Sequence, residues 1–323
     1  MAYSEAVLRR AQARLAQEKA DCEAESTARI ETIYTRLPRL REIDRAMRQS
    51  VSKAVSAAFR RGSDPTEAIR AIKEENLALQ REREWILEAN DLDEAALEPS
   101  VICPKCGGSG YTGAVMCECL QELCRQEQKK ELSSLLGGKE SFDAFRLEYY
   151  PVEFDPSFGV SPRQLMQLNF QECRRYAREF SRRSPSLLFT GGPGLGKTYL
   201  SACIARTVAD SGFSVVYDTA GKLFSDFEAV KFGGYRSDLT NKYLQCDLLI
   251  MDDLGTEMTT QFTQSVLYQV INTRLMENKP VILSTNLNDE GLRQRYTPSI
   301  VSRLLGAYQV FQFLGRDIRQ LRR

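Results

Sequence analysis

The sequence predicts an α/β chain in three parts: an all-α N-terminal domain, a small cysteine-rich knot and a C-terminal α/β domain. Apolar residues recur every three or four positions over residues 1–97, as on one face of a helix. A cluster of four cysteines then precedes a series of short apolar runs that end in glycine, carboxylate or amide residues, as strands of an α/β domain do. We place domains at 1–97, 98–125 and 161–323, with residues 126–160 as a linker and lead-in.

Composition limits the class of protein. A length of 323 residues suits about two domains. The formal net charge is +1, from 44 basic and 43 acidic residues, so any nucleic-acid surface must be a local patch. The first residues carry charges and lack the apolar core of a signal peptide, and no window approaches the roughly 20 apolar residues that span a bilayer. We expect a cytoplasmic protein with no membrane partner, whose nine cysteines stay reduced.

The N-terminal domain is predicted to be helical throughout. Its apolar stripes lie among Arg, Glu, Lys and Gln, and Pro38 interrupts the first pattern. The run Gly62-Ser63-Asp64-Pro65 is typical of a stop and restart, with Asp64 as N-cap and Pro65 at the first helical position. One interpretation is a small three-helix bundle with a solvated exterior. The other is a docking module for another protein.

The cysteine knot has the ligand spacing of a metal site. Two cysteine pairs lie ten residues apart, in the patterns CxxC and CxC: Cys103, Cys106, Cys117 and Cys119. Four thiolates give zinc a closed tetrahedral site, and a chain without histidine offers no other common ligand set. We therefore predict a structural Zn²⁺ site. Cys124 is a possible substitute in the second pair, and the alternative is a set of unliganded cytosolic thiols.

A phosphate-binding loop follows the first apolar strand of the C-terminal domain, Leu187–Thr190. Gly191, Gly196, Lys197 and Thr198 satisfy G-x-x-x-x-G-K-[ST], the P-loop pattern, and an apolar helix follows. Backbone N–H groups and the helix N-terminus would face the phosphates of ATP, Lys197 would reach the β- and γ-phosphates, and Thr198 would ligate Mg²⁺. The predicted nucleotide-binding residues are Gly191, Gly192, Pro193, Gly194, Leu195, Gly196, Lys197, Thr198 and Tyr199.

Two further strand ends carry polar side chains suited to nucleotide hydrolysis. The apolar run Leu248–Met251 ends in Asp252 and Asp253, the Walker B arrangement. Asp252 would hold Mg²⁺ through water, and Asp253 would orient the attacking water. The strand Val281–Ser284 is followed by Asn286, which we expect to hydrogen-bond the attacking water or the γ-phosphate.

In combination these motifs resemble the AAA+ ATPases of the DnaC/DnaI/IstB group, the bacterial helicase loaders and the related transposition helper ATPases. The resemblance rests on the P-loop, the Asp-Asp pair, STN after the next strand, IVSRLLG and the terminal GRDIRQ. It reaches the cysteine knot, because CPKCGGSGYTG and CECL resemble the cluster ahead of the ATPase domain in DnaI-like loaders. It implies an AAA+ core with a parallel five-stranded sheet.

The resemblance adds two arginines to the catalytic residues. Arg303 in SIVSRLLG matches the arginine finger, which acts on the nucleotide of a neighbouring subunit, and Arg319 in GRDIRQ matches the sensor-II arginine. Two departures from the family pattern accompany them. Asp253 replaces the glutamate common in AAA+ motors, and too few residues follow the strand Val310–Phe313 for a full lid domain. We expect a slow, switch-like ATPase that self-associates through its AAA+ domains.

Single-stranded DNA contacts are predicted on two segments. The first combines basic and aromatic residues, as single-strand tracks do: Lys222, Lys231, Arg236, Lys242, Phe227, Phe232 and Tyr235. Acidic residues are interleaved, so an amphipathic helix with a solvated face explains the same pattern. The resemblance adds Thr260 and Phe262, just after Walker B.

The function implied is that of an ATP-dependent loader that binds the replicative hexameric DNA helicase through its N-terminal domain and delivers it to single-stranded DNA. The alternative within the group is an IstB-like transposase helper, which the cysteine knot and the long helical extension disfavour. A scaffold that binds nucleotide without hydrolysing it is a second alternative. A metabolic P-loop kinase is a third, but it would leave Arg303 and Arg319 without a role.

Overall fold

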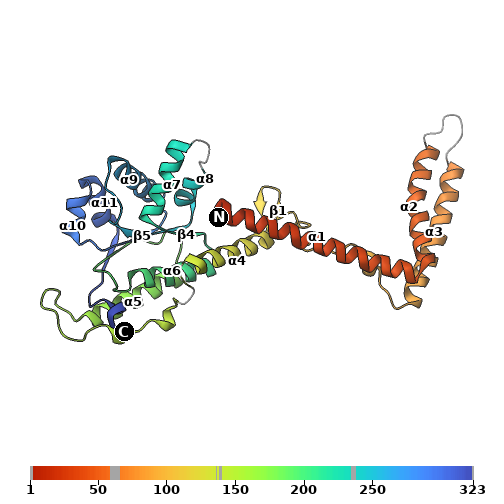
Figure 1. The fold of residues 1–323 in the computed structure, drawn as a ribbon. Helices are drawn as coiled ribbons and strands as arrows, with labels where there is room; N and C mark the ends of the chain where they lie inside the picture. The colour runs from red at the N-terminus through yellow and green to blue at the C-terminus, as the bar shows by residue number, and fades with distance from the viewer. Residues whose placement is uncertain (1–2, 59–65, 136, 138–139, 234–237, 322–323) are drawn as a thin grey trace. The chain divides into compact units, whose positions relative to one another are not determined.

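A computed structural model describes residues 3–58, 66–135, 137, 140–233 and 238–321 (Figure 1). The chain divides into two compact units. Residues 13–117 form one unit, and residues 118–323 together with the first twelve residues form the other.

The helical region contains α1 (Glu5–Arg36), α2 (Pro38–Ala58) and α3 (Thr66–Ala89). Helices α2 and α3 run antiparallel, since Arg39 and Asp44 near the start of α2 bond Glu82 and Arg83 near the end of α3. The last turns of α1 close this pair around a small apolar core. The structure thus differs from a bundle of three helices side by side, because only the end of α1 packs against the pair. The predicted break at Gly62–Pro65 lies outside the described residues.

A short hairpin occupies the cysteine-rich segment. A 3₁₀ turn (Glu94–Leu97) precedes it, and strands β1 (Tyr111–Thr112) and β2 (Val115–Met116) pair antiparallel. Few apolar side chains of this segment are buried, so its shape has little support from a hydrophobic core.

A five-stranded parallel sheet forms the centre of the second unit, as predicted. In space its order is β4 (Val215–Thr219), β5 (Leu248–Leu254), β6 (Val281–Thr285), β3 (Leu187–Thr190) and β7 (Gln309–Gln312). Every pairing in it is parallel. Strand β3 lies inside the sheet between β6 and β7, so the loop that follows it opens at the carboxyl edge beside the ends of its neighbours. Ligands of open α/β sheets bind at this edge.

Helices cover both faces of the sheet (Figure 1). One core joins the sheet to α4, α5 and α6, and a second joins it to α7, α8, α9, α10 and α11. After β7 the described residues hold one short helix, α12. The bounds are α4 (Glu118–Leu135), α5 (Pro162–Arg178), α6 (Lys197–Asp210), α7 (Ala220–Gly233), α8 (Asp238–Gln245), α9 (Gln261–Met276), α10 (Asp289–Arg295), α11 (Pro298–Ala307) and α12 (Ile318–Leu321), with 3₁₀ turns at Phe142–Ala144 and Leu147–Tyr149.

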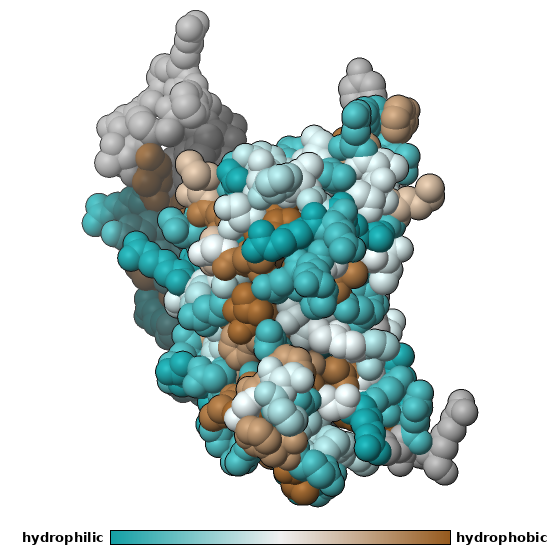
Figure 2. Space-filling view, turned by 90° about the vertical axis from the view of Figure 1, so that its left-hand side faces the viewer, coloured by the Kyte–Doolittle hydropathy of each residue, from teal (hydrophilic) through white to brown (hydrophobic). Residues whose placement is uncertain are grey.

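The molecular surface mixes polar and apolar residues. The face in Figure 2 shows brown hydrophobic patches between teal hydrophilic ones. Exposed apolar side chains of the second unit include Val152, Phe154 and Phe158, between the second 3₁₀ turn and α5, and Val310 on the edge strand β7. None of the described helices is long and apolar enough to cross a membrane.

Candidate functional site

The P-loop joins the buried strand β3 to α6 through a backbone that only glycine adopts easily. Gly191, Gly194 and Gly196 have φ angles of 137°, 71° and 93°, in the left-handed half of conformational space. A Cβ on Gly194 would lie 1.8 Å from Asp317 Oδ1, and one on Gly196 would lie 2.8 Å from the Tyr150 hydroxyl. The loop is therefore shaped by the side chains packed around it as well as by its own sequence.

Lys197, the first residue of α6, folds back into the loop. Its Nζ donates to Gly191 O (2.6 Å), Gly192 O (2.7 Å) and Asn286 Oδ1 (2.8 Å). The residue is only 5% exposed, and this burial lowers the pKa of its ammonium to about 8 although Asp252 and Asp253 oppose the shift. A phosphate entering the loop would give this ammonium a charged partner in place of carbonyls.

The two Walker B carboxylates lie in different surroundings. Asp252 is 4% exposed and accepts hydrogen bonds from the Tyr217 hydroxyl (2.8 Å), the Ser284 hydroxyl and the Asp253 N–H (3.1 Å). The β5–β6 register breaks between Met251 and Leu254. Asp253, at a φ of 55°, lies within this irregular part of β5 and lines the cavity beside the P-loop. Burial, and then the charge of Asp252, raise the pKa of Asp253.

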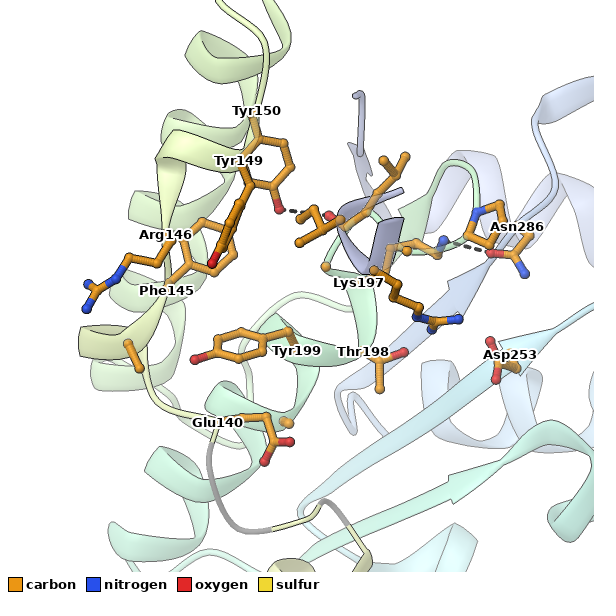
Figure 3. A pocket seen from close by; sticks show the side chains of 18 of the residues that line it. Glu140, Phe145, Arg146, Tyr149, Tyr150, Lys197, Thr198, Tyr199, Asp253 and Asn286 are labelled. Atoms are coloured by element: carbon orange, nitrogen blue, oxygen red, sulfur yellow. Dashed lines mark hydrogen bonds between the residues drawn. The ribbon is translucent and has the colours of Figure 1, made fainter. Parts of the chain in front are cut away.

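A cavity of about 590 Å³ brings most of the predicted catalytic residues together. It is lined by the P-loop from Pro193 to Tyr199, by Asp253 and Asn286 at the strand ends, and by Arg319 of α12. In Figure 3, Lys197, Thr198, Asp253 and Asn286 lie at one side of this space, opposite a group of aromatic rings. Asp252 is not among the residues that line the cavity. The role assigned to each of these residues stays a prediction.

The aromatic wall was missed by sequence reasoning, which treated residues 126–160 as a linker. Phe145, Tyr149 and Tyr150 line the cavity together with Glu140, Ala144 and Arg146 (Figure 3). Tyr150 is 1% exposed and donates its hydroxyl to Leu195 O (2.9 Å), so it fixes a carbonyl of the P-loop. Four aromatic residues in the nine-residue run FDAFRLEYY were a signal that this segment packs rather than links.

Arg303 lies outside the cavity. On α11 its guanidinium stacks over the Tyr268 ring at 4.5 Å, donates to the Tyr268 hydroxyl (2.8 Å) and bonds Asn272 Oδ1 (3.0 Å). These contacts with α9 hold the side chain in one orientation. Action on the nucleotide of a neighbouring subunit stays a prediction.

The predicted DNA segment is divided by its packing. Lys222 pairs with Asp226, and Lys242 pairs with Asp218 (2.9 Å) and Asp226 (3.2 Å). Phe227 is partly buried and stacks on Tyr243. Phe232 stays 74% exposed, next to Lys231, whose ammonium lies 4.8 Å from the centre of the Phe262 ring. Thr260 caps α9, and Tyr235 and Arg236 lie outside the described residues.

The four predicted zinc ligands come together. The sulfur atoms of Cys103, Cys106, Cys117 and Cys119 all lie within 4.8 Å of one another. The Cys103 and Cys117 sulfurs are 3.8 Å apart, and a tetrahedral site with Zn–S bonds of about 2.3 Å spaces its sulfurs by about 3.8 Å. Cys124 is not part of this group, and burial raises the pKa of its thiol to about 11. The donor set therefore fits tetrahedral zinc.

Comparison with known proteins places the ATPase core in a family. The family described as IstB-like ATP binding protein matches residues 147–312, about half of the chain. The chain belongs to this family. The resemblance to the DnaC/DnaI/IstB group is thereby confirmed, and the matched range includes the P-loop, the Walker B aspartates, Asn286 and Arg303.

Several curated relatives of this chain share one name. The chain is 23% identical over 192 residues to the replicative helicase loader DnaC of Buchnera aphidicola subsp. Schizaphis graminum, covering 57% of this chain and 74% of the relative. It is 26% identical over 141 residues to DnaC of Escherichia coli K12, covering 43% and 58%. A solved structure, the crystal structure of the DnaC helicase loader, matches at 18% identity with a TM-score of 0.47, covering 54% of this chain and 97% of that one.

Proposed function

We propose that this protein is an ATP-dependent loader, which binds the replicative hexameric DNA helicase and delivers it to single-stranded DNA. The observation that carries the proposal is the cavity in which Lys197, Asp253, Asn286 and Arg319 converge on the P-loop. Relatives of the IstB-like domain that bear the name replicative helicase loader support the same function.

The cavity suits a nucleoside triphosphate. The N-terminus of α6 and the loop amides would receive the phosphates, and Lys197 would exchange its carbonyl partners for phosphate oxygens. The rings of Phe145, Tyr149 and Tyr150 supply an apolar wall for the base. Thr198 and Asp252 would hold Mg²⁺, which would neutralise phosphate charge. Asp253 and Asn286 both line the cavity, and they would orient the attacking water beside the phosphates.

Turnover would depend on a second subunit. Arg319 lines its own subunit's cavity, whereas Arg303 is fixed on α11 away from it. An arginine finger supplied by a neighbour is worth roughly 10³–10⁵ in rate in NTPases. We therefore propose self-association through the AAA+ domains, with ATP bound between subunits and slow, switch-like hydrolysis.

The parts outside the match receive separate roles. The family match at residues 147–312 does not include the helical region, and the chain spans about three fifths of the length of the Escherichia coli relative. We propose that residues 1–97 bind the helicase and that the cysteine knot holds structural Zn²⁺. For this role the ligands would be Cys103, Cys106, Cys117 and Cys119.

The first experiment is equilibrium binding of ATP with magnesium to the full chain. Lys197→Ala should abolish binding, because it removes the ammonium that the loop positions for the phosphates. Lys129→Ala is the matched control, since Lys129 pairs with Asp210 on the surface. Absence of ATP binding by the folded wild-type protein would refute the proposal.

Arg303→Ala tests the action between subunits. We expect nearly unchanged ATP affinity and a large loss of turnover in the assembled complex. Normal hydrolysis by this variant would show that Arg303 serves only to join α11 to α9.

A transposase helper is the second candidate, favoured by the family match itself. Native mass spectrometry of the chain with a replicative helicase, with and without ATP, should show a defined complex and one zinc per chain. Pull-down of a transposase in place of the helicase would decide for the second candidate. ATP hydrolysis with and without single-stranded DNA separates both from a scaffold that only binds nucleotide.

A further inference from the structure

A basic groove lies on the outer face of α5, the helix that packs against α6 on one side of the sheet. It has a volume of about 360 Å³. We name it the α5 groove; it is lined by Leu147, Gln167, Phe170, Gln171, Arg174, Arg175, Arg178 and Glu179. None of these residues was assigned a role in ATP binding or in the cysteine knot.

Three arginines dominate the charge of the α5 groove. Arg174 and Arg178 are four residues apart, which places them about 6 Å apart along the helix, and Arg175 lies between them. Arg182 and Arg183 continue the basic run past the end of α5. Against the three lining arginines, Glu179 is the one acidic residue of the lining, so the groove carries a net positive charge.

The arginines are weakly held. Arg174 approaches Asp143 at 3.7 Å, but the Asp143 side chain is 91% exposed, and Arg175 pairs with Glu172 at the surface. Arg178 makes no ion pair within the part of the chain that the structure describes. Exposed pairs of this kind contribute little, so an incoming polyanion would replace them at small cost.

The α5 groove also shares a wall with the nucleotide cavity. Phe170 lines the groove, Phe145 lines the cavity, and their rings stack with centroids 5.1 Å apart. Leu147 of the groove belongs to the same short segment as Tyr149 of the cavity. A ligand in the groove would thus be separated from bound nucleotide by these two stacked rings.

We propose that the α5 groove binds the sugar–phosphate backbone of a nucleic-acid strand. Guanidinium groups match phosphate in a bidentate way, the amides of Gln167 and Gln171 add donors, and the apolar floor suits sugar and base faces. On the predicted track of α7 and α8, Lys222 and Lys242 pair with aspartates that are largely buried, whereas the carboxylates that pair with Arg174 and Arg175 are exposed. This inference rests on the proposed function, because that function is the reason to take nucleic acid as the polyanion.

The test is the affinity of the full chain for a fluorescent single-stranded oligonucleotide, measured by anisotropy over a range of salt concentrations. The variant carries Arg174→Ser, Arg175→Ser and Arg178→Ser. Each phosphate contact on a single strand contributes about 0.7 to the slope of log K against log salt, so losing three should reduce the slope by about 2. We expect weaker binding with that smaller slope.

The control removes the same charge elsewhere, through Lys129→Ser, Lys130→Ser and Arg293→Ser on exposed positions of α4 and α10. It should keep the wild-type slope. A variant with lysine at the three groove positions should recover most of the wild-type slope. If the triple serine variant does not fold, Arg178→Ser alone tests the inference, because it should reduce the slope by about 0.7.

Three results would overturn the inference. The first is an unchanged salt slope in the groove variant, and the second is an equal loss of slope in the control variant. The third is a groove variant that binds the oligonucleotide normally but no longer binds the helicase, which would show that the groove binds an acidic protein surface. ATP binding measured on the same samples keeps the proposed function separate. If the groove variant binds ATP and helicase normally and its slope is unchanged, the inference fails and the loader proposal stands.

Discussion

The P-loop and the cysteine-rich hairpin are both glycine-rich turns, but they are held in different ways. In the P-loop, Gly194 lies against Asp317 and Gly196 against Tyr150, so neighbouring side chains determine the backbone path. In the hairpin, Gly113 has no atom within 4 Å of an added Cβ. In the hairpin, the close contacts are instead those among the four cysteine sulfur atoms. The comparison teaches that packing shapes the P-loop, whereas a metal bound by the four cysteines would shape the hairpin.

The largest expected effect is loss of zinc from the hairpin. Cys103→Ser removes one of four thiolates, and a structural zinc site contributes on the order of 10 kcal/mol to a small fold. We expect loss of zinc from the purified protein and rapid proteolysis within residues 101–120, measured by metal analysis and limited digestion. ATP binding should remain.

Cys124→Ala is the control for this change, because Cys124 is buried outside the cluster. It should retain one zinc per chain. Zinc retained by Cys103→Ser, or proteolysis at unchanged rates, would show that the hairpin does not depend on the metal.

The next largest effect is expected from replacing one glycine in each loop by alanine. Gly194→Ala adds a clash with Asp317 to the left-handed strain of about 1–2 kcal/mol, whereas Gly113→Ala adds only the strain. We expect Gly194→Ala to weaken ATP binding at least tenfold and Gly113→Ala to leave it unchanged. Equal ATP affinity in the two variants, measured by titration, would contradict packing as the determinant of the P-loop.

A smaller effect is expected from the hydroxyl that fixes the P-loop. Tyr150→Phe leaves the Leu195 carbonyl without its donor, at a cost of about 1–3 kcal/mol. We expect ATP affinity to fall several-fold while the melting temperature shifts by only a few degrees. Tyr176→Phe is the control, since its hydroxyl donates to the Pro185 carbonyl (3.0 Å), outside the P-loop. An equal fall in both variants would remove Tyr150 from the positioning of the loop.

The smallest effect is the pH dependence set by Lys197. Its pKa in the folded protein is about 8, below the ordinary 10.5, because burial disfavours the ammonium. The folded state therefore loses this proton first, and its contribution makes the free energy of unfolding rise between pH 8 and 10.5. Over the same range ATP affinity should fall. The free energy of unfolding is measured as the difference between wild type and Lys197→Ala, and ATP affinity is measured on the wild type alone. A difference in unfolding free energy that stays flat over this pH range would contradict the buried ammonium.

Motifs with fixed local geometry could be predicted from sequence. The P-loop, the strand before it and the Asp-Asp pair depend on residues adjacent in the chain, and β3 begins and ends where the apolar run predicts. The four clustered cysteines follow the same logic, because ligand spacing over 17 residues leaves few ways to arrange them. In each case the residues that determine the local geometry lie within one short segment of the chain.

Features that depend on distant partners were not predictable. The aromatic wall at Phe145 and Tyr150 is defined by contact with α6 and the P-loop, which lie some fifty residues further on. Lys242 forms partly buried ion pairs because Asp218 and Asp226 approach it from other elements. The place of α1 beside the helical pair likewise depends on tertiary contacts, since all three helices show similar apolar spacing.

The backbone at Asp253 explains a substitution that the sequence alone presents as a weakness. At a φ of 55°, this position favours the short side chains of aspartate and asparagine, whose polar groups stabilise left-handed residues locally. Glutamate would extend one methylene further toward the phosphates while straining the chain beneath it. A longer side chain at this position would therefore come closer to the phosphates but would strain the backbone. The irregularity in β5 lets the shorter aspartate line the cavity without that strain.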